Sequence, residues 1–138
     1  MRFGEGSGDL PDLVIESHPD IVFIAMGLND NFSYDLAAEA IHDQIGDDFV
    51  RLRAALPSAR FLAVEPFWYT DDHPESLAAI SGWVRDAAAR IGADCVAGAS
   101  RWIQGHPEWM AADGLHPNEL GYAEMTKRMN AALSTLGL

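Results

Sequence analysis

Basic residues are scarce in this sequence: 9 Lys and Arg residues stand against 21 Asp and Glu residues, which gives a formal net charge of −12. A chain with this excess of negative charge repels phosphate backbones, so binding to nucleic acid through a basic surface is not expected. The same repulsion disfavours anionic membrane surfaces.

Cysteine and long apolar runs are scarce as well. Cys95 is the single cysteine, which excludes a disulfide within the chain and suits a reducing compartment. No apolar run approaches the roughly 18 residues of a membrane helix. The first ten residues lack the cationic and apolar regions of a signal peptide. We therefore expect a cytoplasmic protein with no membrane span.

What is present is the composition of an ordinary globular protein. The chain has 138 residues, of which 49% are hydrophobic and 22% are charged. This length predicts a single domain over residues 1–138. No combination of His, Cys, Asp and Glu has convincing metal-ligand spacing, so we expect no metal site.

The apolar residues form two kinds of pattern that alternate along the chain. Short continuous runs predict strands at 21–26, 60–64 and 93–97. Apolar residues at three- and four-residue steps predict helices at 9–17, 34–56, 74–91 and 118–136. Strands that alternate with helices predict an α/β fold with a parallel sheet between two helical layers. A continuous run such as 21–26 favours a strand covered on both faces.

The segment Asp113-Gly114-Leu115-His116-Pro117-Asn118 carries the clearest chemical signal. A separation of three residues brings Asp113 and His116 to one side of a turn, where the carboxylate can accept the proton of one ring nitrogen. The other nitrogen is then free to act as a general base. The pattern also allows a simpler interpretation, in which Asp113 is a turn residue and His116 caps the last helix, with Pro117 at its first position.

Two further segments are candidates for binding an oxyanion. Gly27-Leu28-Asn29-Asp30 follows the strand at 21–26, so the Asn29 amide can point at a developing negative charge, while Gly27 allows close approach of a ligand. Alternatively this segment is a turn in which Asp30 caps a helix. The backbone amides of Ser7-Gly8-Asp9 can form an anion-binding loop, or Asp9 simply caps the first helix.

Together these segments resemble the SGNH hydrolase superfamily, the GDSL-type lipases, esterases and acylhydrolases. Gly27-Leu28-Asn29-Asp30 is similar to the family's Gly-x-Asn-Asp block, and Asp113-Gly114-Leu115-His116-Pro117 is similar to its Asp-x-x-His block. Ser7-Gly8-Asp9 resembles the block that carries a conserved glycine in that family. The resemblance extends from about Gly6 onward and implies a flavodoxin-like α/β/α fold.

The resemblance also implies a role for each matching residue. His116 resembles the general base, Asp113 its orienting carboxylate, Asn29 a side-chain oxyanion donor and Gly8 a backbone oxyanion donor, with Gly6 as the alternative to Gly8. The implied reaction is hydrolysis of a small acyl ester through a Ser-His-Asp centre, without a metal or organic cofactor.

The chain departs from the family pattern in one respect. It contains no Gly-Asp-Ser motif, which holds the family's nucleophile after the first strand. The resemblance therefore implies an N-terminally truncated fold whose first strands are missing. Gly6-Ser7-Gly8 superficially resembles a nucleophile turn, but no strand precedes Ser7 to hold it rigid, and its register is that of the glycine block.

Two expectations follow from this departure. The strand at Ile21–Met26 becomes an apolar sheet edge, so we expect it to be covered by a second copy of the chain, a domain swap or a complementing fragment. The function is either that of a serine esterase whose nucleophile block is absent from this chain, or that of a catalytically inactive remnant that binds or assembles. An unrelated flavodoxin-like binding domain is a third interpretation.

Overall fold

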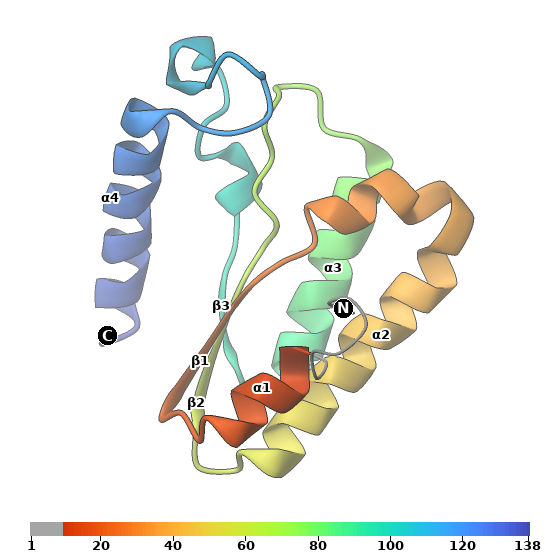
Figure 1. Cartoon of the computed structure of the whole chain (residues 1–138). Helices are drawn as coiled ribbons and strands as arrows, with labels where there is room; N and C mark the ends of the chain where they lie inside the picture. The colour runs from red at the N-terminus through yellow and green to blue at the C-terminus, as the bar shows by residue number, and fades with distance from the viewer. Residues whose placement is uncertain (1–9) are drawn as a thin grey trace.

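Strands and helices alternate along the chain in the computed structural model, which describes residues 10–138 (Figure 1). The helices are α1 (Leu10–Glu16), α2 (Tyr34–Ala55), α3 (Glu75–Arg90) and α4 (Glu119–Thr135). The strands are β1 (Ile21–Ala25), β2 (Arg60–Val64) and β3 (Asp94–Val96). Three 3-10 helices are also found in these residues: η1 (Asn29–Ser33), η2 (Ala99–Arg101) and η3 (Pro107–Trp109).

The three strands form one parallel sheet in the order β1-β2-β3. Helices α1, α2 and α3 lie on one side of this sheet and α4 lies on the other (Figure 1). The α/β architecture with a parallel sheet between two helical layers, which the alternating pattern predicts, is therefore confirmed.

The core is built around β2, because this strand has a neighbour on each side and helices on both faces. Its alternate residues separate into two layers, as the pleat of a strand requires. Phe61 and Ala63 pack toward α2 and α3, whereas Leu62 and Val64 pack toward α4, and all four are at most 1% exposed. The positions of α3 and α4 are thus fixed by opposite faces of one strand.

Strand β1 differs from the prediction of a strand covered on both faces. Val22 packs against α2, but Ile21 and Phe23 on the other face are each 49% exposed. Helix α4 is the element on that side of the sheet, and it packs on β2 and β3 rather than on β1. Phe23 therefore has no helical layer above it within residues 10–138.

The predicted helices occur, but not all of their apolar residues reach the core. In α2, the non-helical backbone at Ala37 interrupts the register, and Leu36 before it is 93% exposed. In α4, Met129 and Leu133 pack on the sheet while Leu120 in the first turn is 63% exposed. No helix in residues 10–138 has the length and apolarity that crossing a membrane requires.

Candidate active site

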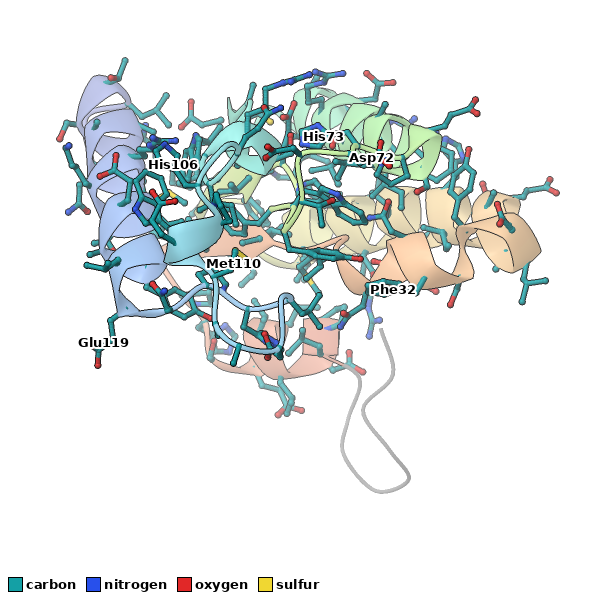
Figure 2. The ribbon with its side chains drawn as sticks, turned by 90° about the horizontal axis from the view of Figure 1, so that it is seen from above. Phe32, Asp72, His73, His106, Met110 and Glu119 are labelled. Atoms are coloured by element: carbon teal, nitrogen blue, oxygen red, sulfur yellow. The ribbon has the colours of Figure 1, made fainter. Side chains whose placement is uncertain are left out.

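Two segments with candidate residues, the turn at Gly27–Asn29 and the loop at Asp113–His116, lie at the same end of the sheet. β1 leads into Gly27 and η1, and the chain after β3 leads through η2 and η3 to the loop that precedes α4. Because the strands are parallel, their carboxyl ends meet at one edge, which is the usual ligand-binding edge of such sheets. Figure 2 looks down on this edge, with the segment around Met110 between α4 and Phe32 of η1.

Asp113 and His116 form a close pair in that loop. The Oδ2 atom of Asp113 lies 2.8 Å from Nδ1 of His116. The Oδ1 atom of the same carboxylate accepts hydrogen bonds from the backbone N–H groups of Leu115, at 2.9 Å, and of His116, at 3.0 Å. Gly114 between them has φ of +66°, in the left-handed region that glycine adopts without a steric penalty.

This geometry combines two of the interpretations that the sequence leaves open. Asp113 is a turn residue through Oδ1 and the partner of the imidazole through Oδ2. The backbone N–H of His116, followed by the ring and the N–H of Leu115, lowers the pKa of Asp113 well below its ordinary value. A carboxylate that stays charged is suited to hold a proton on Nδ1 of the ring.

His116 is not a helix cap, contrary to the alternative interpretation. Asn118 caps α4, since its side chain accepts hydrogen bonds from the N–H groups of Leu120 and Gly121. Pro117 precedes this cap and lies in an antiparallel bridge with Met110, so it is not the first residue of the helix. The imidazole therefore projects from a loop, three residues before α4 begins at Glu119.

The second ring nitrogen of His116 is accessible. Its side chain is 61% exposed, and no hydrogen bond to Nε2 is found within residues 10–138. With the proton on Nδ1 held by Asp113, Nε2 carries the lone pair and can accept a proton from a bound reactant. This is the arrangement that a general base requires.

Asn29 lies at the start of η1, one residue beyond the turn at Gly27 and Leu28. Its side chain is exposed, and no hydrogen bond engages its amide in the described part of the chain. Asn29 follows β1, and the chain that leads to His116 follows β3. Because β2 lies between these two strands, β1 and β3 are about 10 Å apart. Asp30 caps no helix, since α2 begins after Ser33.

Gly27 is confined both by its backbone and by its neighbours. It has φ of +107°, and a Cβ atom there would lie 2.7 Å from Pro66 and 2.9 Å from Ile80. The sequence does not single out Asn31, whose Nδ2 donates to the carbonyl of Gly27 at 2.8 Å. Its signal is an asparagine four residues after the strand-ending glycine, a spacing from which a side chain can bond the turn. Together these residues fix the turn that presents Asn29.

The remaining candidates give different results. Gly8, with its alternatives Gly6 and Ser7, lies outside the described residues. No cluster of three or more His, Cys, Asp or Glu side chains suited to a metal ion occurs in residues 10–138.

Glu65, at the end of β2, is 4% exposed and binds Arg85 at 3.0 Å and the N–H of Gly98 at 2.6 Å. This carboxylate ties the ends of β2 and β3 together beneath the loops.

A comparison with known families matches residues 4–124 to the model of the GDSL-like lipase/acylhydrolase family. The chain belongs to this family. It is also 30% identical, over 99 residues, to a GDSL lipase of Mycobacterium tuberculosis. The aligned region covers 70% of this chain and 42% of that protein, so the chain spans less than half the length of this relative.

Membership of the GDSL-like family agrees with the architecture. Over residues 10–138, the three-stranded parallel sheet with helices on both sides is consistent with a small flavodoxin-like SGNH fold. The matched range includes both the turn at Gly27–Asn29 and the loop at Asp113–His116. In this GDSL-like chain the two motifs thus lie at the carboxyl edge of the sheet, which is the usual ligand-binding edge of open α/β folds.

Proposed function

We propose that this chain provides part of a centre that hydrolyses small acyl esters. In this proposal His116 is the general base, Asp113 orients it, Asn29 donates to the oxyanion, and Gly8 contributes a backbone N–H. The observation that supports it most strongly is the 2.8 Å contact between Asp113 and Nδ1 of His116, which leaves Nε2 open at the carboxyl end of the sheet.

The proposed reaction requires a serine hydroxyl, which a Gly-Asp-Ser segment outside this chain supplies. The hydroxyl oxygen attacks the ester carbonyl as its proton moves to Nε2 of His116. The tetrahedral intermediate then collapses, the C–O bond to the alcohol breaks, and the leaving alkoxide takes this proton. Water repeats the sequence on the acyl-serine, which releases the carboxylic acid and restores the hydroxyl.

Asn29 and Gly8 have a shared task in this proposal. Both are N–H donors, and an N–H aimed at the carbonyl oxygen is most effective when that oxygen becomes negatively charged. The exposed, unengaged amide of Asn29 and the fixed turn before it favour this role. No long apolar segment is available to form a lid, which favours small, water-soluble esters over lipid aggregates.

The test is the turnover of p-nitrophenyl acetate by the chain and by three variants. Because an imidazole can also activate water against this reactive ester without the serine, we expect His116→Ala to lower turnover and Ser7→Ala to leave it unchanged. The matched control is His42→Ala, because His42 also pairs with a neighbouring carboxylate, that of Asp43 at 3.0 Å, and is 51% exposed on α2. Equal turnover in all four proteins would contradict the proposal. Loss in Ser7→Ala as well would identify Ser7 as the nucleophile.

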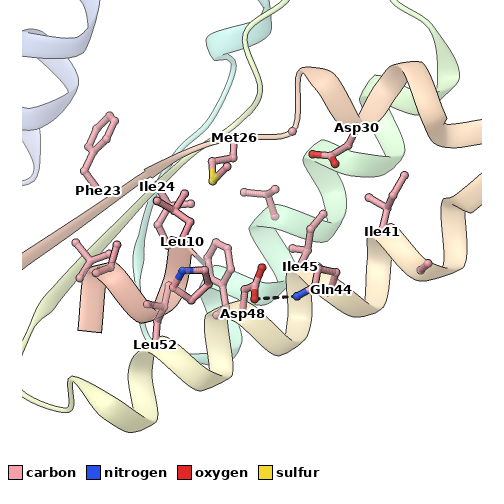
Figure 3. A pocket seen from close by; sticks show the side chains of 17 residues that line it. Leu10, Phe23, Ile24, Met26, Asp30, Ile41, Gln44, Ile45, Asp48 and Leu52 are labelled. Carbon is pink, nitrogen blue, oxygen red and sulfur yellow. Dashed lines mark hydrogen bonds between the residues drawn. The ribbon is translucent and has the colours of Figure 1, made fainter. Parts of the chain in front are cut away.

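A second candidate function, a catalytically inactive module that binds or assembles, is favoured by a different observation. An apolar groove of about 340 Å³ lies between α1, β1 and α2 (Figure 3). It is lined by Leu10, Ile24, Ile41 and Ile45, with Asp30 among its few polar residues. On the opposite face of β1, Phe23 is half exposed. Both faces of this edge strand thus carry apolar surface in the described residues.

These surfaces also support a proposal about partners, whichever function holds. An extended segment that pairs with the outer edge of β1 would place alternate side chains over the groove and beside Phe23. We propose that a second copy of the chain or a complementing fragment provides this strand. Covering an apolar edge in this way removes a hazard for aggregation.

A further inference from the structure

Asn118 uses every hydrogen-bonding group of its side-chain amide. Its Oδ1 accepts from the N–H groups of Leu120, at 3.0 Å, and Gly121, at 3.1 Å, which caps α4. Its Nδ2 donates to the carbonyl groups of Glu108, at 2.8 Å, and Met110, at 3.1 Å. The first pair of bonds lies within the helix terminus, whereas the second pair reaches back to the segment that precedes the Asp113 loop.

That segment pairs with the residues around His116 in a short antiparallel ribbon. The N–H of Ala111 donates to the carbonyl of His116 at 2.8 Å, and the N–H of Asn118 donates to the carbonyl of Trp109 at 2.8 Å. Met110 and Pro117 face each other between these bonds. The backbone of His116 is therefore held by the ribbon, and the ribbon is fastened to α4 by the Asn118 amide.

Gly121 permits the close contact between ribbon and helix. It is buried, and a Cβ atom at this position would meet the carbonyl oxygen of Trp109 and lie 2.9 Å from Cβ of Pro117. Any other residue would push the ribbon away from the first turn of α4. Both residues thus hold the ribbon against the first turn of α4. Asn118 does so by its hydrogen bonds, and Gly121 by leaving space for the ribbon.

We propose that Asn118, with Gly121, is a positioning residue for His116: by fastening the ribbon to α4, it keeps the imidazole against Asp113 with the proton on Nδ1. This role in catalysis depends on the proposed function, in which His116 is the base. The competing explanation is that Asn118 only caps α4. The two explanations differ in which half of the amide matters, since the cap needs Oδ1 and the ribbon needs Nδ2.

The variant Asn118→Ser distinguishes the two explanations, because serine keeps an acceptor that can cap α4 but cannot replace both donors to the ribbon. The readouts are the tautomer of His116, from the nitrogen-15 shifts of its ring at neutral pH, and hydrogen exchange at the Ala111 amide. We expect mainly the Nδ1–H form in the unmodified chain and mainly the Nε2–H form in the variant. Loss of two hydrogen bonds should speed Ala111 exchange by about tenfold. Asn130→Ser, at an exposed site on the same helix, is the matched control.

An unchanged tautomer and unchanged Ala111 exchange in Asn118→Ser would overturn the proposal, provided that circular dichroism shows the fold intact. If that variant does not fold, Gly121→Ala decides. Alanine favours the helix by about 1 kcal/mol over glycine, yet its Cβ displaces the ribbon, so the tautomer should change while helicity does not fall. An unchanged tautomer there would also overturn it. If the tautomer changes in the variant, but the unmodified chain and His116→Ala hydrolyse p-nitrophenyl acetate equally, the positioning role is supported and the proposed function is contradicted.

Discussion

At the scale of single residues, Asp113 joins local structure to chemistry. One oxygen of its carboxylate closes the turn by accepting two backbone N–H groups, and the other faces the ring of His116. Both sets of donors favour the charged form, so the pKa of Asp113 is lowered. The contribution of such a group to the native state is present above its ordinary pKa and is lost only as the pH falls through the lowered value.

The lowered pKa of Asp113 predicts that its carboxyl group is protonated only at a lower pH than an ordinary Asp. In the unmodified chain, the Asp113 carboxyl should remain ionised at the pH of about 3.9 at which an ordinary Asp is half protonated. In His116→Ala the ring is lost but the two backbone N–H donors remain, so the pKa should rise only part of the way. Carbon-13 shifts of the carboxyl group measure both curves. A midpoint at the ordinary value in the unmodified chain would show that these contacts do not form.

At the scale of elements, the junction between β1 and η1 determines where Asn29 is presented. Gly27 turns the chain with a positive φ while it lies against Pro66 and Ile80, which belong to the loop after β2 and to α3. The nitrogen of Asn31 then bonds the Gly27 carbonyl from within η1. A strand end, a loop and two helices therefore meet at a position that has no room for a side chain.

Gly27→Ala should therefore destabilise the chain by about 3 kcal/mol, through backbone strain and overpacking together. The matched control is Gly92→Ala, because Gly92 also has a positive φ, of +68°, but its Cβ would meet nothing within 4 Å. That variant should cost about 1 kcal/mol from the backbone alone. Urea unfolding of both variants measures the difference, and equal losses would show that the contacts with Pro66 and Ile80 do not matter.

At the scale of the whole molecule, the sheet is asymmetric. One outer strand, β3, has α4 packed over it, while the other, β1, has an apolar groove on one face and a half-exposed Phe23 on the opposite face within residues 10–138. An edge strand with an apolar sequence offers unpaired backbone groups to any extended segment. The covering strand that we propose would therefore pair with the chain on this side of the molecule.

Light scattering of the chain across a range of concentrations tests this point. We expect a species larger than the 15.0 kDa chain, and Phe23→Lys should shift it toward the monomer because a charge cannot be buried at the new interface. Leu36→Lys is the matched control, since it makes the same change in charge at a residue 93% exposed on α2. A stable monomer whose β1 amides exchange freely would contradict the proposed covering of this edge.

Elements could be predicted where the pattern depends on local geometry. The run at 60–64 coincides with β2, and the helical pattern at 74–91 differs from α3 by one residue at each end. The contact between Asp113 and His116 was also predictable, because a separation of three residues brings the two side chains within reach of each other. The exposure of Phe23 was not, since an apolar run contains no information about which neighbouring helix is present to cover it.

The sequence by itself therefore determined the alternation of strands and helices, the parallel sheet and the pairing of a carboxylate with an imidazole across a short turn. These features depend on hydrophobic periodicity and on the reach of a few bonds. Only the tertiary structure decided that Asn118 ties the His116 ribbon to α4, that Gly27 lies against Pro66 and Ile80, and that β1 has two apolar faces. Those features depend on contacts between segments far apart in the chain, whose distances are set by packing.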